Sequence, residues 1–309
     1  MIKKYPIESK LVACLGAVNI DRIYKCKNTH IMRDSNISDL SESVGGVMYN
    51  ITSSLNSLLC KTKLISFIGD DKESAMIIKH LSKIGINISS IKKIKNQKTG
   101  SYTAIQDKSG EIIIGVNEMS IIEEIKPQFI EKIINNTFAK TWVIDSNFKR
   151  EPIEKIIYLL KNKKLIATAV SVYKAPRLKP ALKYLDYLFL NQDELFALAP
   201  KEKNIRKAID KILKLGTKNI FVTLGSRGAI AASGTEYIKK KNYPTKIIDL
   251  NGAGDAFCGS AIACIQKELP LKYTLDYALS TSSLIAEVKG SIRSNLTNKL
   301  ITDKIKKFS

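Results

Sequence analysis

The sequence predicts an α/β fold, in which a mostly parallel central β-sheet carries helices on both faces and a smaller β-sheet lies beside it. Two observations predict this fold: short apolar runs alternate with helical patterns along most of the 309 residues, and two segments of short alternating strands interrupt that order. A composition with 44% hydrophobic residues supplies the core of one large α/β domain. Because the chain contains no internal repeat or proline-rich linker, we expect a single domain over residues 1–309.

The apolar runs have the length of buried strands. Leu11–Ile20 follows two lysines, as a secretory signal would, but it is short and includes Asn19 just before Asp21, so we expect a first buried strand. Five further runs are predicted to join the same sheet: Leu64–Ile68, Trp142–Asp145, Leu165–Ala169, Tyr187–Leu190 and Ile220–Leu224.

Helical periodicity fills the segments between these runs. Gly85 and Gly216 stand where two of the patterns stop, as glycine commonly does at helix C-termini. The predicted helices are Glu73–Ile84, Glu151–Lys161, Leu178–Leu185, Ile205–Leu215 and Ala253–Gln266. Strands that alternate with helices in this way favour parallel pairing with helices on both faces of the sheet.

Residues 21–43 and 99–117 interrupt the alternation. Asp21–Ser43 and Thr99–Asn117 each read as short strands of alternating polarity, and the second contains a turn at Asp107–Gly110. We expect the two segments to pair into a small sheet that projects from the main body.

Composition excludes several classes of protein. No run of about 18 apolar residues is present, so the sequence predicts no membrane span. The five cysteines lack metal-ligand spacing, which favours reduced thiols and a cytoplasmic location. His30 and His80 are isolated, which argues against a histidine-based nucleophile or zinc site.

The formal charge of +21 raises nucleic acid as a partner. The lysines, however, are spread along the whole chain without an aromatic-and-basic cluster or a basic tail. We therefore expect a solvated basic surface and no nucleic-acid partner.

The segment Leu250–Ser260 carries the strongest chemical signal. Gly252 and Gly254 allow successive backbone N–H groups to face one anion, and the following helix adds the positive end of its dipole. Asp255 beside such a cradle is suited to accept the proton of an alcohol that attacks a phosphoryl group. Taken alone, this short string favours a simpler interpretation, in which Asp255 caps the helix or complements its dipole.

Two further motifs follow predicted strands. Asn191 and Glu194 stand one helical turn apart at the carboxyl end of a strand, where they suit Mg²⁺ and its waters, or form a common N-cap pairing. Thr223–Gly228 contains two glycines that let the backbone turn beneath a phosphate, or simply form a strand–turn–strand corner.

Asp249–Phe257 resembles the C-terminal signature of the ribokinase-like (PfkB) carbohydrate and nucleoside kinases, D-T-x-G-A-G-D-x-F, with Asn251 as a departure. The resemblance implies a ribokinase-like three-layer sandwich whose small sheet forms a lid over the sugar. It implies that Asp255 is the catalytic base and that Gly252, Ala253 and Gly254 form the anion hole. Lids of this family often pair, which implies a homodimer through the lid.

The same resemblance assigns the nucleotide side. It implies ATP as phosphoryl donor, with Asn191 and Glu194 acting around Mg²⁺ through water. It also implies a monovalent cation such as K⁺ near Asp249 and Asn251. The residues that would contact ATP are Asn191, Thr223, Gly225, Ser226, Gly228 and Gly254. By analogy, Ser280–Gly290 would help enclose the adenine.

On the substrate side, Gly16–Asp21 and Gly45–Asn50 resemble the sugar-binding motifs of the family. Hydroxyls of a ribose would bind Asn19, Asp21 and Asn50, while Gly45 and Gly46 let the main chain approach the ring closely.

Three stretches are similar to the pseudouridine kinases within this family. These are Gly45–Ile51, the lid segment from Tyr102-Thr103-Ala104 to Asn117-Glu118-Met119, and Val170–Ala175. The similarity adds Tyr102, Thr103 and Lys174 to the substrate site. The chain departs from that group at Glu118, where Asp is usual, and at Thr168-Ala169, where Asp-Pro is usual.

The sequence therefore predicts ATP-dependent phosphorylation of the 5′-hydroxyl of pseudouridine, a small-molecule nucleoside. Two alternatives stay open: a ribokinase or other sugar or N-nucleoside kinase, and a nucleic-acid-binding protein built on an inactive kinase fold.

Overall fold

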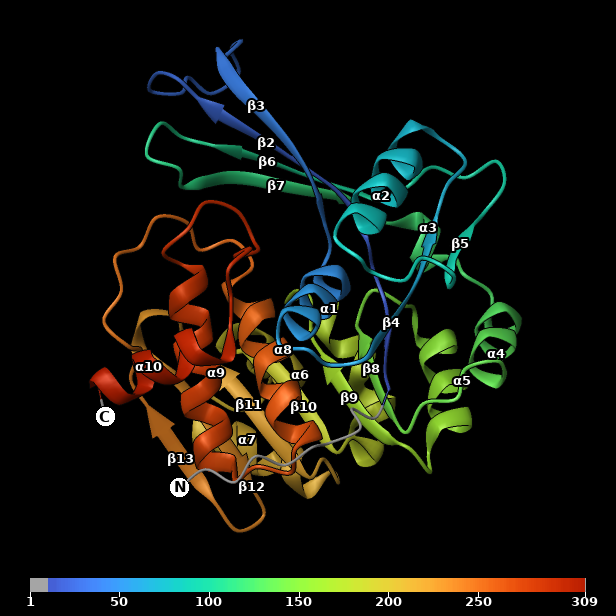
Figure 1. The fold of residues 1–309 in the computed structure, drawn as a ribbon, viewed down its shortest axis with the longest axis vertical. Helices are drawn as coiled ribbons and strands as arrows, with labels where there is room; N and C mark the ends of the chain where they lie inside the picture. The colour runs from blue at the N-terminus through green and yellow to red at the C-terminus, as the bar shows by residue number, and fades with distance from the viewer. Residues whose placement is uncertain (1–10, 309) are drawn as a thin grey trace.

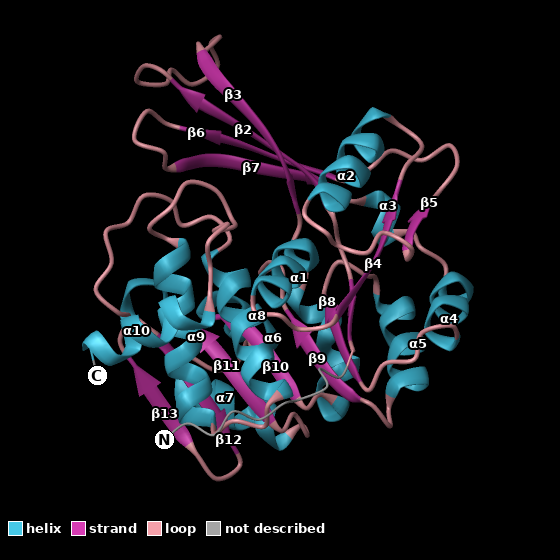
Figure 2. Cartoon of the chain, in the orientation of Figure 1, coloured by secondary structure: helices cyan, strands magenta, loops and turns pink. Residues whose placement is uncertain are grey.

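A nine-stranded sheet runs through the computed structural model, which describes residues 11–308 (Figures 1 and 2). Its strand order is β13-β12-β11-β10-β9-β8-β1-β4-β5, and every pair is parallel except β11 with β12 and β12 with β13. The strands are β1 (Val12–Leu15), β4 (Thr62–Ile68), β5 (Ile91–Lys93), β8 (Thr141–Asp145), β9 (Lys164–Thr168), β10 (Tyr187–Asn191), β11 (Asn219–Thr223), β12 (Ala229–Ser233) and β13 (Tyr237–Lys240).

Helices cover both faces of this sheet, as the alternation of the sequence predicts. On one face, helices pack against the side of β1 that carries Ala13 and Leu15: α3 (Ser120–Glu123), α4 (Pro127–Asn135), α5 (Arg150–Leu160), η1 (Ala175–Tyr184), α6 (Gln192–Leu198) and α7 (Ile205–Lys214). On the other face, helices pack against the side that carries Val12 and Cys14: α1 (Val47–Ser57), α2 (Lys72–Lys83), α8 (Ala253–Gln266), α9 (Leu271–Ile285) and α10 (Asn298–Phe308). The predicted α/β architecture is confirmed.

The second sheet has the order β3-β2-β6-β7 and projects over one end of the main body (Figure 1). Its strands are β2 (Asn19–Cys26), β3 (Ser38–Gly45), β6 (Ser101–Gln106) and β7 (Ile112–Glu118). We call this four-stranded sheet the lid. The prediction that residues 21–43 and 99–117 pair into a small separate sheet is confirmed.

The predicted first strand, Leu11–Ile20, is wrong as a single element. β1 ends at Leu15, and β2 of the lid begins at Asn19. Between them the backbone bonds to side chains and leaves the sheet, because Ala17 N donates to Asp145 Oδ2 at 2.8 Å and Val18 N donates to Ser66 Oγ at 3.1 Å.

The prediction of a helix over Leu178–Leu185 needs a second correction. The segment is a 3₁₀ helix, η1, that begins earlier, at Ala175. Pro180 lies inside it and has no N–H to donate, which removes one bond of the α-helical pattern and favours the tighter turn.

Among the described residues, no helix is both long and apolar enough to cross a membrane.

Candidate active site

The N-terminus of α8 is the centre of the candidate site. Gly252 precedes the helix with φ 73°, and a Cβ there would lie 2.4 Å from the Cβ of Ser291. A side chain at this position is therefore excluded by both backbone strain and contact. A Cβ at Gly254 would meet no atom within 4 Å, so the first turn of α8 opens onto free space. The predicted cradle of Gly252, Ala253 and Gly254 has the geometry of an anion site at a helix N-terminus.

Asp255 lies in this first turn. Its Oδ2 accepts a hydrogen bond from Asn50 Nδ2 at 2.7 Å. Burial raises the pKa of the Asp255 carboxyl to about 7, against the lowering effect of the Asn50 hydrogen bond. Three further carboxylates add to the increase by their negative charge: Asp21, Glu194 and Asp145. A carboxylate that titrates near neutral pH suits general-base chemistry.

The sugar-side motifs converge at the base of the lid. Asn19 Nδ2 donates to Asp21 Oδ1 at 2.6 Å, and burial raises the pKa of Asp21 to about 6. A Cβ at Gly45 would lie 2.1 Å from Asp21 Oδ2, while Gly46 has φ 104° and a Cβ there would lie 2.6 Å from the carbonyl oxygen of Ala17. Both positions require glycine, because the Asp21 carboxylate packs against one and the backbone of Ala17 against the other.

The two lid residues predicted at the substrate site face opposite ways. Tyr102 is the register partner of Asp21, so both side chains lie on the face turned toward the site, and burial together with the charge of Asp21 raises the pKa of Tyr102. Thr103 is the partner of Arg22, which reaches Glu73 of α2 at 2.8 Å on the other face. The structure does not bring Thr103 together with the other candidates.

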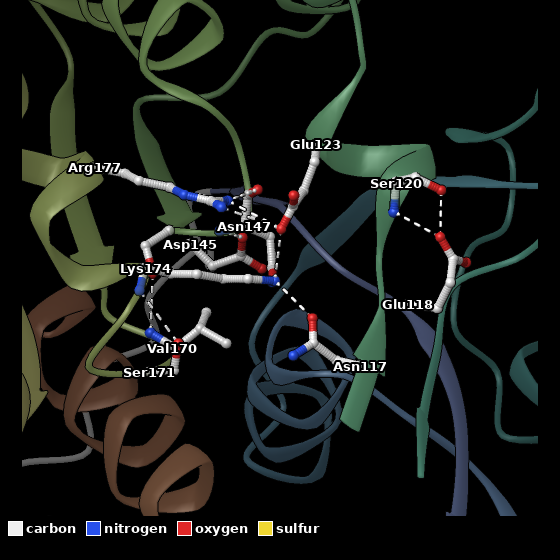
Figure 3. A network of polar contacts seen from close by, with 11 residues as sticks. Asn117, Glu118, Ser120, Glu123, Asp145, Asn147, Val170, Ser171, Lys174 and Arg177 are labelled. Atoms are coloured by element: carbon white, nitrogen blue, oxygen red, sulfur yellow. Dashed lines mark hydrogen bonds and ion pairs between the residues drawn. The ribbon is translucent and has the colours of Figure 1, made fainter. Parts of the chain in front are cut away.

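Lys174 is the centre of a buried polar network that joins the lid to the main body (Figure 3). Its Nζ donates to Asn147 Oδ1 at 2.9 Å and to Asn117 Oδ1 of β7 at 3.3 Å, and it pairs with Glu123 at 3.0 Å. Arg177 pairs with the same Glu123 oxygen at 3.2 Å. Lys174 is 4% exposed, and these three oxygens fix the position of its charge.

Sequence reasoning missed the partners of Lys174 and one buried acid. Asp145 is fully buried at the end of β8, where its oxygens accept hydrogen bonds from Ala17 N and Asn147 N. Its position at the carboxyl end of a parallel strand is the signal that could have found it.

Glu118, a departure from the pseudouridine kinase pattern, accepts a hydrogen bond from Ser120 N at 3.1 Å at the start of α3.

Asn191 and Glu194 form the capping box that was the alternative interpretation. Asn191 Oδ1 accepts from Glu194 N at 2.9 Å, and Glu194 Oε2 accepts from Asn191 N at 2.8 Å. Both residues nevertheless line a hollow of about 160 Å³ that also receives Thr223, Gly254 and Asp255. Burial raises the pKa of Glu194. The structure thus brings the two motif residues to the α8 cradle.

The loop after β11 also has the geometry of its alternative interpretation, a strand–turn–strand corner. Gly225 and Gly228 have φ of 60° and 91°, and Leu224 N donates to Gly228 O at 2.8 Å. A Cβ at Gly228 would lie 1.9 Å from Lys240 O. Thr223 lines the hollow, whereas Ser226 is exposed on the turn.

Asp249 and Asn251 lie where the segment before α8 meets the loop after α9. Asp249 Oδ1 accepts from Asn251 N and Oδ2 accepts from Gly290 N, each at 2.9 Å. Ile248 N donates to Ala286 O at 2.8 Å. The two segments therefore lie side by side, and both oxygens of Asp249 are held by backbone amides.

Comparison with known proteins identifies the family and the fold of the chain. Residues 9–298 match the family described as pfkB family carbohydrate kinase. The chain is 24% identical over 285 residues to the pseudouridine kinase of Escherichia coli strain K12, with 90% of each chain covered. It is 27% identical over 311 residues to a ribokinase of Dictyostelium discoideum, covering 91% of this chain and 95% of the relative. The solved structure of Arabidopsis thaliana ribokinase complexed with ribose and ATP superposes with a TM-score of 0.82 at 20% identity, covering 97% and 99%.

Proposed function

Because the chain belongs to the pfkB family of carbohydrate kinases, we propose that it transfers the γ-phosphoryl group of ATP to the 5′-hydroxyl of pseudouridine. As a kinase of this family it is a phosphotransferase with an alcohol acceptor. The observation that carries the proposal is the position of Asp255, which lies in the first turn of α8 beside the open Gly254 and accepts a hydrogen bond from Asn50, with a carboxyl pKa of about 7.

In the proposed reaction, each residue at the N-terminus of α8 has one role. Asp255 takes the proton of the 5′-hydroxyl as its oxygen bonds to the γ-phosphorus, and the bond from that phosphorus to the bridging oxygen breaks to release ADP. The amides of Gly252, Ala253 and Gly254 stabilise the negative charge on the transferred group. The products are pseudouridine 5′-phosphate and ADP.

The hollow beside the cradle fits a nucleotide with Mg²⁺. Asn191 and Glu194 line it with oxygen atoms, the ligand type that Mg²⁺ prefers, and the capping box leaves Oε1 of Glu194 for a metal-bound water. When bound, Mg²⁺ neutralises charge on the β- and γ-phosphates. We assign the phosphates of ATP to Thr223, Gly225, Ser226, Gly228 and Gly254, and a K⁺ ion to the carbonyls around Asp249 and Asn251.

The sugar and base are assigned to the lid side. Asn19, Asp21 and Asn50 supply polar groups for the ribose hydroxyls, and Tyr102 and Lys174 lie toward the space where the base would bind. The match to the pseudouridine kinase of E. coli supports pseudouridine as the substrate. The match to the D. discoideum ribokinase supports the alternative, ribose or another nucleoside.

A substrate panel tests this function. The purified protein is assayed with ATP and Mg²⁺ against pseudouridine, uridine, adenosine, ribose and fructose, and kcat/KM is compared. We expect pseudouridine to exceed every other acceptor by at least about tenfold, a difference of about 1.4 kcal/mol at the transition state. A higher value for ribose or uridine would replace the substrate. Steeply salt-dependent RNA binding without phosphoryl transfer would favour the inactive-kinase alternative.

We also propose that the protein forms a homodimer through the lid. The outer lid face carries a cross-strand apolar row, because Leu40 pairs with Tyr24, Tyr24 with Ile105 and Ile105 with Ile114. Leu40 and Ile114 are 50% and 52% exposed. A second lid would cover this row. Sedimentation should give a dimer that Ile114→Lys converts to a monomer.

The five cysteines, all unpaired, are consistent with a cytoplasmic setting.

A further inference from the structure

Three side chains from distant parts of the sequence form a hydrogen-bonded chain that ends at the candidate base. Ser291, in the loop after α9, donates from Oγ to Asn50 Oδ1 at 3.0 Å. Asn50, in the first turns of α1, donates from Nδ2 to Asp255 Oδ2 at 2.7 Å. Asn50 is 5% exposed, so water does not compete freely for its amide.

The direction of this chain is set by the chemistry of its middle member. An amide has an acceptor end and a donor end, and Asn50 presents its oxygen to Ser291 and its NH₂ to the carboxylate. If the amide turned over, its oxygen would face Asp255 Oδ2 across 2.7 Å, and two acceptors would repel. The ionised carboxylate can only accept, so it takes the NH₂ end of Asn50, and the Ser291 hydroxyl donates to the oxygen end and holds the amide in that orientation.

Packing holds Ser291 in place for this role. A Cβ at Gly252 would lie 2.4 Å from Ser291 Cβ, so the serine fits only against a glycine. The adjacent residue, Gly290, donates its N–H to Asp249 Oδ2 at 2.9 Å. Ser291 is therefore fixed to the segment that builds the anion cradle, and its hydroxyl points across the cleft to α1.

We propose that Ser291 is a positioning residue, which through Asn50 holds Oδ2 of Asp255 and leaves Oδ1 to the acceptor alcohol. No hydrogen bond from another described residue holds Oδ1. The second N–H of the Asn50 amide remains for a sugar hydroxyl, so one side chain aligns both the base and the alcohol. This role rests on the proposed function, because it requires Asp255 to be the base.

The relay also affects the charge state of the base. A hydrogen bond donated to an ionised carboxylate favours the charged form, and the Asn50 bond opposes the rise in pKa that burial imposes on Asp255. Without Ser291 the oxygen end of the amide loses its donor, the bond from Asn50 to Asp255 is held less firmly, and the pKa of Asp255 rises further. A smaller fraction of the enzyme then has an ionised base below neutral pH.

The test compares Ser291→Ala with Ser294→Ala across pH 5.5–9. Ser294 is an exposed serine of the same loop outside the relay, and its alanine variant should match the parent. We expect Ser291→Ala to lower kcat by about tenfold near pH 6, with the deficit shrinking above pH 8 and the KM for ATP unchanged. Unchanged kcat, or a deficit equal at every pH, would overturn the relay.

Two further measurements separate the relay from folding and from the proposed function. In an Asn50→Ala background, Ser291→Ala should have no additional effect on kcat, whereas additive losses would show that Ser291 does not act through Asn50. The ¹³C titration of the Asp255 carboxyl should move to higher pH in Ser291→Ala, and this readout needs no turnover. If Asp255→Asn keeps full activity, the base assignment fails and the relay fails with it; if only Ser291→Ala behaves like its control, the relay alone fails.

Discussion

The proposed phosphate end and the proposed sugar end of this site are built in different ways. At the phosphate end, the backbone of Gly252–Gly254 presents the functional groups, and the nearby side chains of Asn191, Glu194 and Asp249 are held by hydrogen bonds to local amides. At the sugar end, side chains present the functional groups, and several of them stand on the lid. On the proposed function, phosphoryl transfer would depend on main-chain shape, whereas substrate choice would depend on individual side chains and on the position of the lid.

The largest expected effect is the loss of the base, on which both ends depend. Asp255→Asn should lower kcat by about 10²–10⁴-fold, the usual contribution of general-base catalysis, while the backbone cradle still binds ATP. Steady-state kinetics and calorimetric ATP binding measure the two quantities. Turnover equal to that of the parent would contradict the assignment.

A backbone change at the phosphate end should come next. Gly252→Ala adds a Cβ 2.4 Å from Ser291 Cβ at φ 73°, so we expect kcat to fall by about 10²-fold and the free energy of unfolding to fall by about 1–3 kcal/mol. Gly85→Ala is the matched control, because Gly85 also has φ 73° but a Cβ there meets nothing within 4 Å. Equal losses of stability in the two variants would show that backbone strain alone causes the effect and that contact with Ser291 contributes nothing.

A side-chain change at the sugar end should act on the substrate only. Lys174→Met removes the buried charge that joins Asn117, Asn147 and Glu123, and should lower kcat/KM for the nucleoside by about 10-fold or more. The KM for ATP should stay near that of the parent. A rise in the KM for ATP would break the separation between the two ends.

Raising the pH through 7 should increase the activity of the protein but decrease its stability. The pKa of Asp255 is raised to about 7 in the folded state, so kcat should rise as pH increases through 7 and the base ionises. In the unfolded chain the pKa of this carboxyl is about 4, so the unfolded chain ionises more readily than the folded one. The protein therefore loses stability as the pH rises from about 4 to about 7. Asp255→Asn should therefore increase the free energy of unfolding at pH 8 by about 1–3 kcal/mol, and not at pH 4. Thermal unfolding at both pH values measures this, and equal stability of both proteins at pH 8 would contradict it.

The smallest effect is expected at Thr103. Its side chain lies on the lid face with Arg22, away from Asp21, so Thr103→Ala should change kcat/KM by less than about twofold. Tyr102→Phe, on the inner face beside Asp21, is the matched comparison and should weaken nucleoside binding more. An effect at Thr103 as large as that at Tyr102 would show that the lid faces the substrate differently.

Most of the core could be predicted because buried parallel strands are continuous apolar runs. The helices α1 and α9 were harder, since α1 is rich in serine and starts at a glycine motif, and α9 is buried nearly all round. The antiparallel strands β12 and β13 could not be separated from loops by composition. Leu11–Ile20 was misassigned because apolarity does not reveal that the chain leaves one sheet for another at Gly16.

In the candidate site, the sequence predicts which motifs supply the functional residues, and these assignments stay predictions; the contacts of those residues could not be predicted. Periodicity gives no indication that Glu123, Asn147 and Arg177 surround Lys174, since they come from separate elements and are common residue types. Asn50 was assigned to the sugar, and only the packing of α1 on α8 reveals that it contacts Asp255. Side chains alternate between the two faces of a strand, and this alternation could have predicted that Tyr102 and Thr103 of β6 face opposite sides of the lid.

The route by which the chain enters and leaves the lid has one more consequence. Three residues separate the end of β1 from the start of β2, and β3 leads through Gly46 directly into α1, the helix that carries Asn50. On the proposed function, a displacement of the small sheet would therefore also move Asn50, whose amide would align the base. In that case a raised lid would leave the proposed base poorly directed toward water, and bound ATP would be protected from hydrolysis until an acceptor closes the site.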